Sequence, residues 1–255
     1  MAEPQFEVRL AQSDEDLRAA QRLRYRVFVE ELGGGGEMVD HAGRFECDRF
    51  DDFGDHMILV DHGRDAGALD QVVGVYRLMR RENAEAAGQF YSESEYDLAP
   101  LTASGRRLLE LGRSCLAPEY RGGVAMYHLW NGLAGYVALH EIEILFGVAS
   151  FHGTDIAALA QPLSLLWHRH LAPEALRVRS KVYQPMDLIP ADNLDRRAAM
   201  LQVPALIKAY LRLGGVVGDG AFVDHEFNTT DICLIMDTAR MNAARRDIYG
   251  REGRA

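Results

Sequence analysis

The alternation of apolar and polar positions predicts a strand and then a helix at the start of the chain. Residues 6–11, "FEVRLA", alternate with the period of two that is typical of a strand. Ser13 then supplies an N-cap, and Asp14, Glu15 and Asp16 form an acidic first turn for a helical stretch that continues to Leu32. The glycines at 33–36 should end this helix.

The middle of the chain predicts a hairpin followed by a crossover. Two β-rich runs, 56–62 and 71–79, are separated by a segment with the composition of a hairpin loop, so we expect them to pair antiparallel. The stretch "LLELGRSCLAPEYRGG" (108–123) holds the next strand, closed by a proline and a pair of glycines. A helical pattern over 126–141 and a buried strand over 143–150 follow, and a strand–helix–strand order favours parallel pairing.

The remaining pattern predicts further alternation of helices and strands. Thr154 and Asp155 should open a helix that runs to residue 170 and is disturbed at Pro162. A strand over 176–185, a helix over 192–213 and two closing strands, 216–227 and 230–237, complete the order. The sum is one α/β domain over 1–255, with a mixed sheet flanked by helices and a flexible C-terminal tail at 241–255.

Composition narrows the function classes. A chain of 255 residues with 48% hydrophobic and 26% charged residues is an ordinary globular protein, and its net charge of -10 excludes general nucleic-acid affinity. No run of 18 apolar residues occurs, so we expect no transmembrane segment and a cytoplasmic protein, with peripheral contact at the inner face of the membrane left open. Cys47, Cys115 and Cys233 are interpreted as reduced thiols, and the histidines lack the spacing of a metal site.

A charged pair interrupts the apolar strand that begins at Leu108. Glu110 has core-forming neighbours, so its carboxylate lies either in the core or at a cleft, and a nearby Arg113 would keep it ionised as a general base. Strict alternation sends the two side chains to opposite faces, but Gly112 between them admits a bulge that would bring both to one cleft. An ion pair of Glu110 with Arg113 or Arg77, without any chemistry, is the alternative.

Two further features suggest contacts with an anionic partner. The segment "PEYRGG" offers consecutive backbone N–H groups at a helix N-terminus, which can hold a phosphate, although a plain helix start is an equal interpretation. Downstream, cations recur on one face of an extended strand and one turn apart on a helix, as a patch for an anionic partner or as ordinary solubilising charge. The residues concerned are Arg121, Gly122 and Gly123 in the loop, and Arg177, Arg179, Lys181, Lys208 and Arg212 downstream.

An ordered set of residues resembles the acyl-homoserine lactone synthases. Arg24 and Phe28 lie four apart, Asp48 and Asp51 three apart, Arg77 ends a strand, and "LELGR" supplies Glu110 and Arg113. The resemblance implies the GNAT acyltransferase fold and an acyl carrier protein thioester as donor. From Arg121 the chain reads "RGGVAM", similar to the phosphate-binding loop of GNAT acetyltransferases but with Val124 and Met126 at positions where small residues are expected.

Most of the remaining chain resembles a sister family. Residues 129–155 and 203–237, together with the first-helix block, are similar to the ornithine N-acyltransferases of bacterial ornithine lipid synthesis. This resemblance implies transfer of a 3-hydroxyacyl group from acyl carrier protein to the α-amine of L-ornithine, which gives lyso-ornithine lipid. It implies no cofactor, because the acyl-phosphopantetheine of the carrier is a substrate. Two alternatives are an acyl-homoserine lactone synthase that consumes S-adenosylmethionine and a non-catalytic module that binds acyl groups or the carrier.

The resemblances and the chemistry of the residues assign roles to this set. An amine must be neutral to attack a thioester, so Glu110 is the expected base, with Arg113 beside it as the second catalytic residue. Asp48 and Asp51 would supply countercharge to the ammonium groups of ornithine, and an arginine would bind its carboxylate. The expected substrate-binding residues are Arg24, Phe28, Asp48, Asp51 and Arg77.

Overall fold

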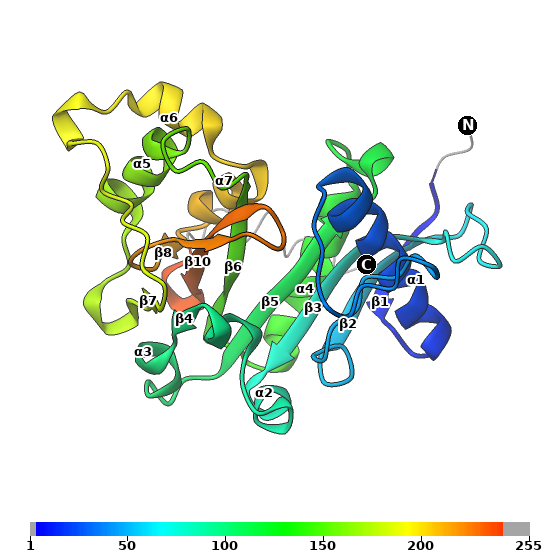
Figure 1. The fold of residues 1–255 in the computed structure, drawn as a ribbon. Helices are drawn as coiled ribbons and strands as arrows, with labels where there is room; N and C mark the ends of the chain where they lie inside the picture. The colour runs from blue at the N-terminus through cyan, green and yellow to red at the C-terminus, as the bar shows by residue number, and fades with distance from the viewer. Residues whose placement is uncertain (1–3, 242–255) are drawn as a thin grey trace. The chain divides into compact units, whose positions relative to one another are not determined.

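The computed structural model describes residues 4–241, which divide into two compact units (Figure 1). The first unit comprises residues 4–88 and Leu111–Glu141, and the second comprises Gln89–Glu110 and residues 142–241. Strand β5 (Leu108–Leu116) passes from the second unit to the first between Glu110 and Leu111. The single domain over 1–255 stays a prediction, and the tail predicted at 241–255 lies, beyond its first residue, outside the described residues.

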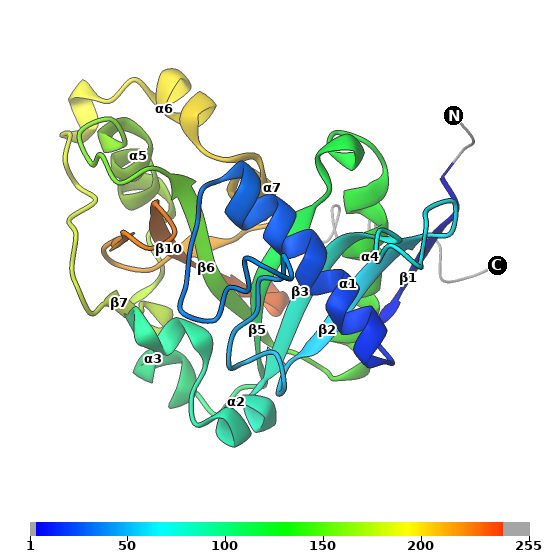
Figure 2. The same cartoon turned by 45° about the vertical axis from the view of Figure 1, so that its right-hand side comes forward.

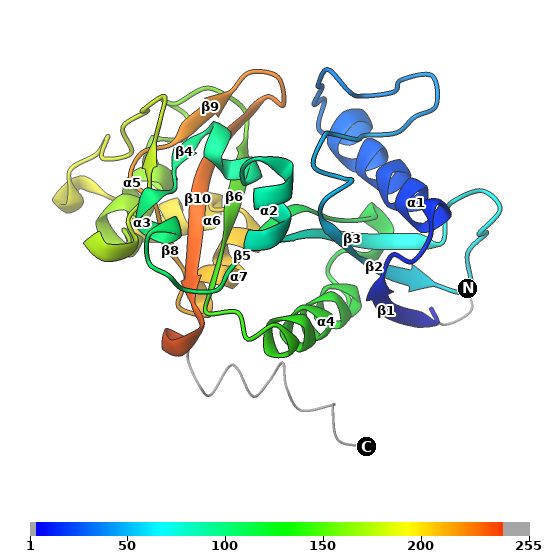
Figure 3. The same cartoon turned by 90° about the horizontal axis from the view of Figure 1, so that it is seen from below.

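The first unit is a sheet covered by one helix on each face. Strands β1 (Phe6–Leu10), β2 (Asp55–Asp61) and β3 (Val72–Arg80) pair antiparallel in this order, and the end of β5 lies beside β3. Helices α1 (Asp14–Arg24) and α4 (Ala125–Leu139) cover the opposite faces (Figure 3). The predicted hairpin is confirmed, and its strands are buried on both faces because both helices cover them.

The first helix begins as predicted but changes its winding. Ser13 Oγ accepts a hydrogen bond from the backbone N–H of Asp16 at 3.2 Å, which confirms the N-cap. After Arg24 the chain continues as a π-helix, η1 (Tyr25–Glu31), and the helical stretch ends before Gly33, whose φ is 73°. The end was therefore predicted and the π-helix was not. Such wider turns occur frequently at functional sites.

The second unit is built around one long antiparallel pair. Strand β6 (Ile144–His152) pairs antiparallel with β10 (Thr229–Asp237) and parallel with β5 at Leu108–Glu110, which confirms the predicted crossover. Strands β8 (Val216–Val217) and β9 (Phe222–Asp224) both pair with β10. The single strand expected over 216–227 is thus two, because the turn between them requires Gly220, whose φ is 81°.

The helices of the second unit begin and end at other residues than the sequence predicted, and the differences lie near prolines. Helix α5 (Ala160–His170) starts six residues later than expected, so Pro162 falls in its first turn, where a missing N–H causes no disturbance. The helix expected over 192–213 is two helices, α6 (Arg196–Gln202) and α7 (Ala205–Arg212). Pro204 separates them because it forces Val203 into an extended backbone. Helix α6 packs beside α5 (Figure 2).

Short elements complete the two units. The strand expected over 176–185 is reduced to β7 (Arg179–Ser180), which pairs with β4 (Tyr96–Asp97). Helices α2 (Arg81–Ala87) and α3 (Ala99–Thr102) follow β3 and β4. The 3-10 turns are η2 (Tyr91–Ser94), η3 (Pro118–Tyr120), η4 (Glu174–Leu176), η5 (Ala191–Asn193) and η6 (Thr238–Arg240). Within residues 4–241, no helix is both long and apolar enough to cross a bilayer.

Candidate active site

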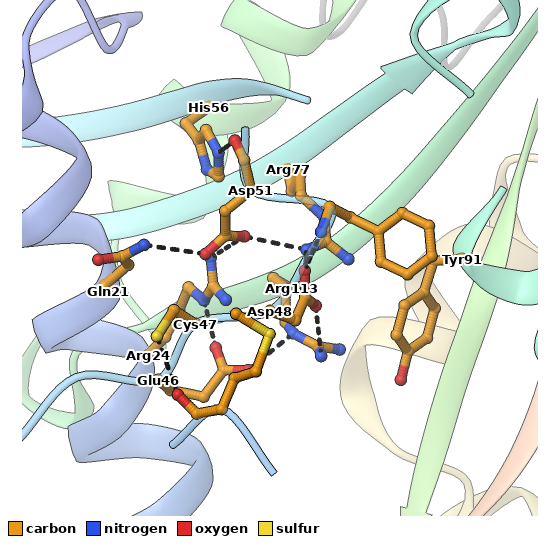
Figure 4. A network of polar contacts seen from close by, with 12 residues as sticks. Gln21, Arg24, Glu46, Cys47, Asp48, Asp51, His56, Arg77, Tyr91 and Arg113 are labelled. Carbon is orange, nitrogen blue, oxygen red and sulfur yellow. Dashed lines mark hydrogen bonds and ion pairs between the residues drawn. The ribbon is translucent and has the colours of Figure 1, made fainter. Parts of the chain in front are cut away.

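Six charged side chains form a closed ring of ion pairs in the first unit (Figure 4). Arg24 is the last residue of α1, and Arg77 and Arg113 come from β3 and β5. The acids come from the loop that precedes β2. We call this set the charged ring; in order around it, the members are Arg24, Glu46, Arg113, Asp48, Arg77 and Asp51.

Every member of the charged ring contacts two members of opposite sign. Arg24 binds Glu46 and donates through Nη1 to Asp51 Oδ1 at 2.7 Å. Arg113 donates through Nε to Glu46 Oε1 at 3.1 Å and through Nη2 to Asp48 Oδ2 at 2.8 Å. Arg77 closes the ring between Asp48 and Asp51, with 3.0 Å to the latter. Three positive and three negative charges therefore balance, which a largely buried cluster requires.

Burial divides the charged ring into a hidden part and an accessible part. The side chains of Arg24, Arg77, Glu46 and Asp51 are at most 3% exposed. Asp48 is 18% exposed and Arg113 is 12% exposed, and the two contact each other. A ligand that approaches this unit would therefore reach the Asp48–Arg113 edge first.

The arginines keep the three carboxylates ionised despite burial. Burial by itself would raise the pKa of Glu46, but Arg113 and Arg24 outweigh it and hold the pKa below its usual value. The same opposition lowers the pKa of Asp48 through Arg77 and Arg113, and that of Asp51 through Arg24 and then Arg77. The three carboxylates are therefore ionised at neutral pH.

Neutral groups fix the orientation of the charged ring. Gln21 Nε2 donates to Asp51 Oδ2 at 3.0 Å, and the backbone N–H of Phe50 donates to Asp48 Oδ1 at 2.8 Å. His56 Nε2 lies 2.9 Å from the carbonyl oxygen of Asp51, and burial lowers the pKa of this histidine, so a neutral imidazole donates there. Sequence reasoning missed Gln21, Glu46 and His56, although Glu46 directly precedes Cys47 and Asp48 in the segment that supplied the predicted acids.

Arg113 reaches the charged ring from an unusual backbone. Its φ is 51°, a left-handed conformation that costs free energy for any residue with a Cβ. The sequence predicted the irregularity of β5 at Gly112, and the positive φ falls one residue later. The two ion pairs of Arg113 compensate for this cost, and such strain held in place by its surroundings is common at functional sites.

Glu110 belongs to the second unit, where its carboxylate is buried and well bonded. It is 3% exposed and accepts hydrogen bonds from the backbone N–H of Tyr91 at 2.8 Å and of Ser92 at 2.6 Å. Ser92 Oγ donates to the same carboxylate. N–H and O–H donors of this kind stabilise an ionised carboxylate. Burial, with the charge of Glu110 next in importance, raises the pKa of the Cys233 thiol, so that thiol stays protonated.

The residues predicted to bind the donor lie in two places. In the first unit, Arg121 forms a two-pronged ion pair with Glu31, at 2.5 and 2.8 Å. Gly122 has a φ of 75° and Gly123 follows it in the loop between η3 and α4. A Cβ at Gly122 would meet no atom within 4 Å, so the glycine is required by the backbone conformation and not by space.

In the second unit the predicted cations surround β7 and lie on α7. From Val178 to Lys181, buried and exposed side chains alternate, and the exposed ones are Arg179 and Lys181. The predicted alternation is therefore confirmed at these positions. Arg179 pairs with Asp219 at 2.6 Å and Arg177 Nε donates to the carbonyl of Ala172. Lys181 and Lys208 donate to the backbone carbonyls of Glu93 and Leu201, and Arg212 lies in the last turn of α7.

Comparison with known proteins agrees with this architecture. Residues 23–131 match the acetyltransferase (GNAT) domain family. An N-acyl amino acid synthase from uncultured soil microbes superposes with a TM-score of 0.56, 14% identity and 93% coverage of both chains. A CoA-dependent acyl-homoserine lactone synthase superposes with a TM-score of 0.54, 15% identity, and 96% and 88% coverage of the two chains. The predicted GNAT fold with a mixed sheet is therefore confirmed.

Full-length relatives are much more similar in sequence. The L-ornithine N(alpha)-acyltransferase of Rhodobacter capsulatus is 60% identical over 251 residues, which cover 98% of this chain and 97% of that protein. The L-ornithine N(alpha)-acyltransferase of Brucella abortus is 44% identical, with 97% and 89% coverage. Similarity of this extent includes both units of the structure.

Proposed function

The chain belongs to the L-ornithine N(alpha)-acyltransferase family, and from this premise we propose that it transfers a 3-hydroxyacyl group from acyl carrier protein to the α-amine of L-ornithine. The product would be lyso-ornithine lipid. The observation that carries this proposal is the 60% identity to a relative of that name over nearly the full length of both chains. The lactone synthase alternative was raised by the spacing of the charged residues, and the solved lactone synthase structure matches at only 15% identity, a level that supports the shared fold alone.

Glu110 is the group that we assign to proton transfer. The α-amine attacks the thioester carbonyl, a C–N bond forms, and the C–S bond breaks to release the phosphopantetheine thiol. The amine loses one proton in this step, which Glu110 accepts directly or through water and which the departing thiolate takes up in turn. Support comes from the buried carboxylate of Glu110, which the N–H groups of Tyr91 and Ser92 hold in place.

The accessible edge of the charged ring is the acceptor-binding surface that we propose. Asp48 would face an ammonium group of ornithine, and Arg113, the second predicted catalytic residue, would face its carboxylate. Support comes from exposure, since these two are the accessible members of the charged ring. Arg24, Arg77 and Asp51, predicted as substrate-binding, would then act by holding Asp48 and Arg113 in place. Phe28, half-buried in η1, remains a predicted substrate contact.

The donor assignment rests on local positive charge in an acidic protein. An acyl carrier protein is anionic, and a chain with a net charge of -10 can attract it only through clustered cations. Support comes from Arg179 and Lys181, which are exposed beside β7, and from Arg212 on α7. Arg121, Gly122 and Gly123 are the proposed contacts for the phosphopantetheine phosphate, at the loop that precedes α4.

The decisive experiment offers the purified protein a choice of acceptors. It combines 3-hydroxyacyl carrier protein with an equimolar mixture of amino acids and S-adenosylmethionine, and it identifies the products by mass spectrometry. We expect N-acyl-ornithine and one equivalent of free carrier thiol. An acyl-homoserine lactone would establish the lactone synthase instead, and absence of thiol release would establish a non-catalytic module.

A pair of blocked acceptors tests which amine reacts. Nα-acetyl-ornithine lacks the proposed nucleophile, so we expect no acyl transfer to it. Nδ-acetyl-ornithine keeps the α-amine but loses the second ammonium, so it should react with a raised KM. The reverse pattern would place the reaction on the side-chain amine and overturn the assignment to the α-amine.

A further inference from the structure

A cavity of about 280 Å³ with charged and apolar lining residues lies in the first unit, and its lining is separate from the charged ring. Its wall combines the end of α1 and the start of η1 with the loop between β2 and β3 and the beginning of β3. None of the described residues that line it belongs to the charged ring or to the loop Arg121–Gly123. Its charged lining residues are Arg22, Arg26, Arg44, Arg64, Glu30 and Asp70.

Positive charge is in excess around this pocket. Arg44 pairs with Glu30 and Arg64 pairs with Asp70. Arg26 and Arg64 both reach Glu119 just outside the lining, at 2.8 and 3.1 Å. Four guanidinium groups therefore meet three carboxylates, in a protein whose net charge is -10.

Arg22 carries the charge that these acids do not match. Its Nε is buried and has no hydrogen-bond partner among residues 4–241. Its guanidinium lies over the ring of Phe45, 5.0 Å from the ring centroid, and this contact fixes the side chain. A buried donor without a partner is costly unless a ligand supplies the acceptor.

The other three arginines can change partners at little cost. The side chains of Arg26 and Arg44 are 40% and 53% exposed, and ion pairs at such positions contribute little to stability. Arg64 is shared between two acids, so it can release one of them. A guanidinium fork matches a phosphate group with two parallel hydrogen bonds, and several forks around one pocket favour a group with two negative charges.

We propose that this pocket binds a phosphate group with two negative charges, with Arg22 as its central contact. The volume lies just below the usual range for small-molecule pockets, which suits a free phosphate or the headgroup of an anionic lipid. Apolar lining residues, among them Leu69 and Val72, would accommodate the glycerol end of such a headgroup. The proposal is independent of the acyl transfer, because no residue assigned to that reaction lines the pocket.

Titration calorimetry with inorganic phosphate at constant ionic strength tests the proposal. We expect saturable binding to the full-length protein and at least about tenfold weaker binding to Arg22→Gln, because a charge-assisted contact is lost. The matched control Arg169→Gln removes the same charge from the exposed end of α5 and should bind like the wild type. Arg64→Gln, from a different segment, replaces Arg22→Gln if circular dichroism shows that the latter is unfolded.

Flotation with lipid vesicles identifies the source of the phosphate group. Binding to phosphatidylcholine vesicles only when they contain phosphatidic acid, and loss of that binding in Arg22→Gln, would point to a lipid headgroup. Binding of inorganic phosphate alone would point to a soluble ligand. The proposal fails if the wild type shows neither kind of binding, or if Arg22→Gln and Arg169→Gln lose binding equally. Turnover of Arg22→Gln in phosphate-free, lipid-free buffer should stay at the wild-type level in every case.

Discussion

Arg113 donates to the carboxylate of Asp48 at 2.8 Å from a backbone whose φ is 51°. A left-handed residue other than glycine is uncommon inside a strand, and here it aims the most exposed guanidinium of the charged ring at the most exposed acid. Backbone strain and ligand accessibility therefore coincide at one residue pair.

The strain at Arg113 predicts that glycine is more stable than alanine at this position, the reverse of the usual order in a strand. Both Arg113→Gly and Arg113→Ala remove the ion pairs, but only alanine keeps a Cβ that disfavours a positive φ. We expect Arg113→Gly to be more stable than Arg113→Ala by about 1 kcal/mol in urea unfolding. Arg9 in β1 is a matched control, because it also pairs with an acid but has no positive φ. There glycine should be the less stable by about 0.5–1 kcal/mol, and the same order at Arg113 would contradict the interpretation.

Glu110→Gln should keep the fold and lower turnover by about 100-fold, the usual scale for loss of a general base. The comparison variant is Ser92→Ala, which removes one donor to the carboxylate and leaves the acid in place. It should lose much less activity, and it should keep the acid limb of the pH–rate profile that Glu110→Gln loses. Near-wild-type turnover of Glu110→Gln at saturating ornithine would exclude Glu110 as the base.

Asp48→Asn should raise the KM for ornithine more than it lowers turnover, because a countercharge to a non-reacting ammonium contributes equally to ground state and transition state. The effect should shrink with Nδ-acetyl-ornithine, which has no second ammonium. Asp51→Asn is the buried counterpart, 3% exposed, and we expect it to reduce stability before it changes KM selectively. An unchanged KM in a normally stable Asp48→Asn would remove Asp48 from the acceptor site.

The charged ring predicts loss of stability in acid. Glu46, Asp48 and Asp51 have folded-state pKa values below their ordinary values of 4.5 and 3.8, so the unfolded chain takes up protons first as pH falls. The free energy of unfolding should therefore be constant in this respect above about pH 5.5 and decrease as pH drops through about 4.5 and below. Asp51→Asn removes one of these groups. The free energy of unfolding of this variant should therefore decrease less between about pH 5.5 and 3.5 than that of the wild type, by the contribution of one carboxylate. Equal decreases would mean that Asp51 titrates alike in both states.

The donor assignment predicts a salt-dependent reaction. Attraction between an anionic carrier and exposed cations is screened over about 8 Å at physiological salt, so kcat/KM for the carrier substrate should fall as salt rises. Reversal of Arg177, Arg179 and Lys181 to glutamate should cause the same loss at low salt and leave the KM for ornithine unchanged. If the enzyme uses acyl-coenzyme A as well as acyl carrier protein, and neither salt nor the triple reversal changes the rate, then acyl carrier protein is not the specific donor and these three cations do not bind it.

Local pattern was sufficient to predict much of the architecture. The hairpin of β2 and β3 and the β5–α4–β6 crossover follow from runs of buried β-rich residues and from one long helical pattern, and both were located within a few residues. The break at Pro204 was missed although proline carries a local signal, because the apolar spacing continues on both sides of it. The π-helix after Arg24 has no comparable signal, since its residues also fit an ordinary helix.

The charged ring could be predicted only in part, because its contacts are distant in sequence. Arg24 meets Asp51 across 27 residues, and Arg113 meets Glu46 across 67. Pattern alone identified charges in unusual positions, but it provided no means of pairing them. Glu46 was missed for this reason, since a glutamate beside a cysteine in a polar loop carries no sign of burial, whereas the fold leaves it 1% exposed.

Because β5 contributes residues to both units, the order of synthesis determines which unit can fold first. Every described segment of the first unit has been synthesised once Glu141 emerges, so this unit can fold while β6 and β10 are still to be made. The segment Gln89–Glu110 must wait, because Phe146, the sheet neighbour of Glu110, comes later in the chain. The segments that form the charged ring are therefore complete before the strand that covers Glu110 is made, so the proposed acceptor surface can form before the surroundings of the proposed base.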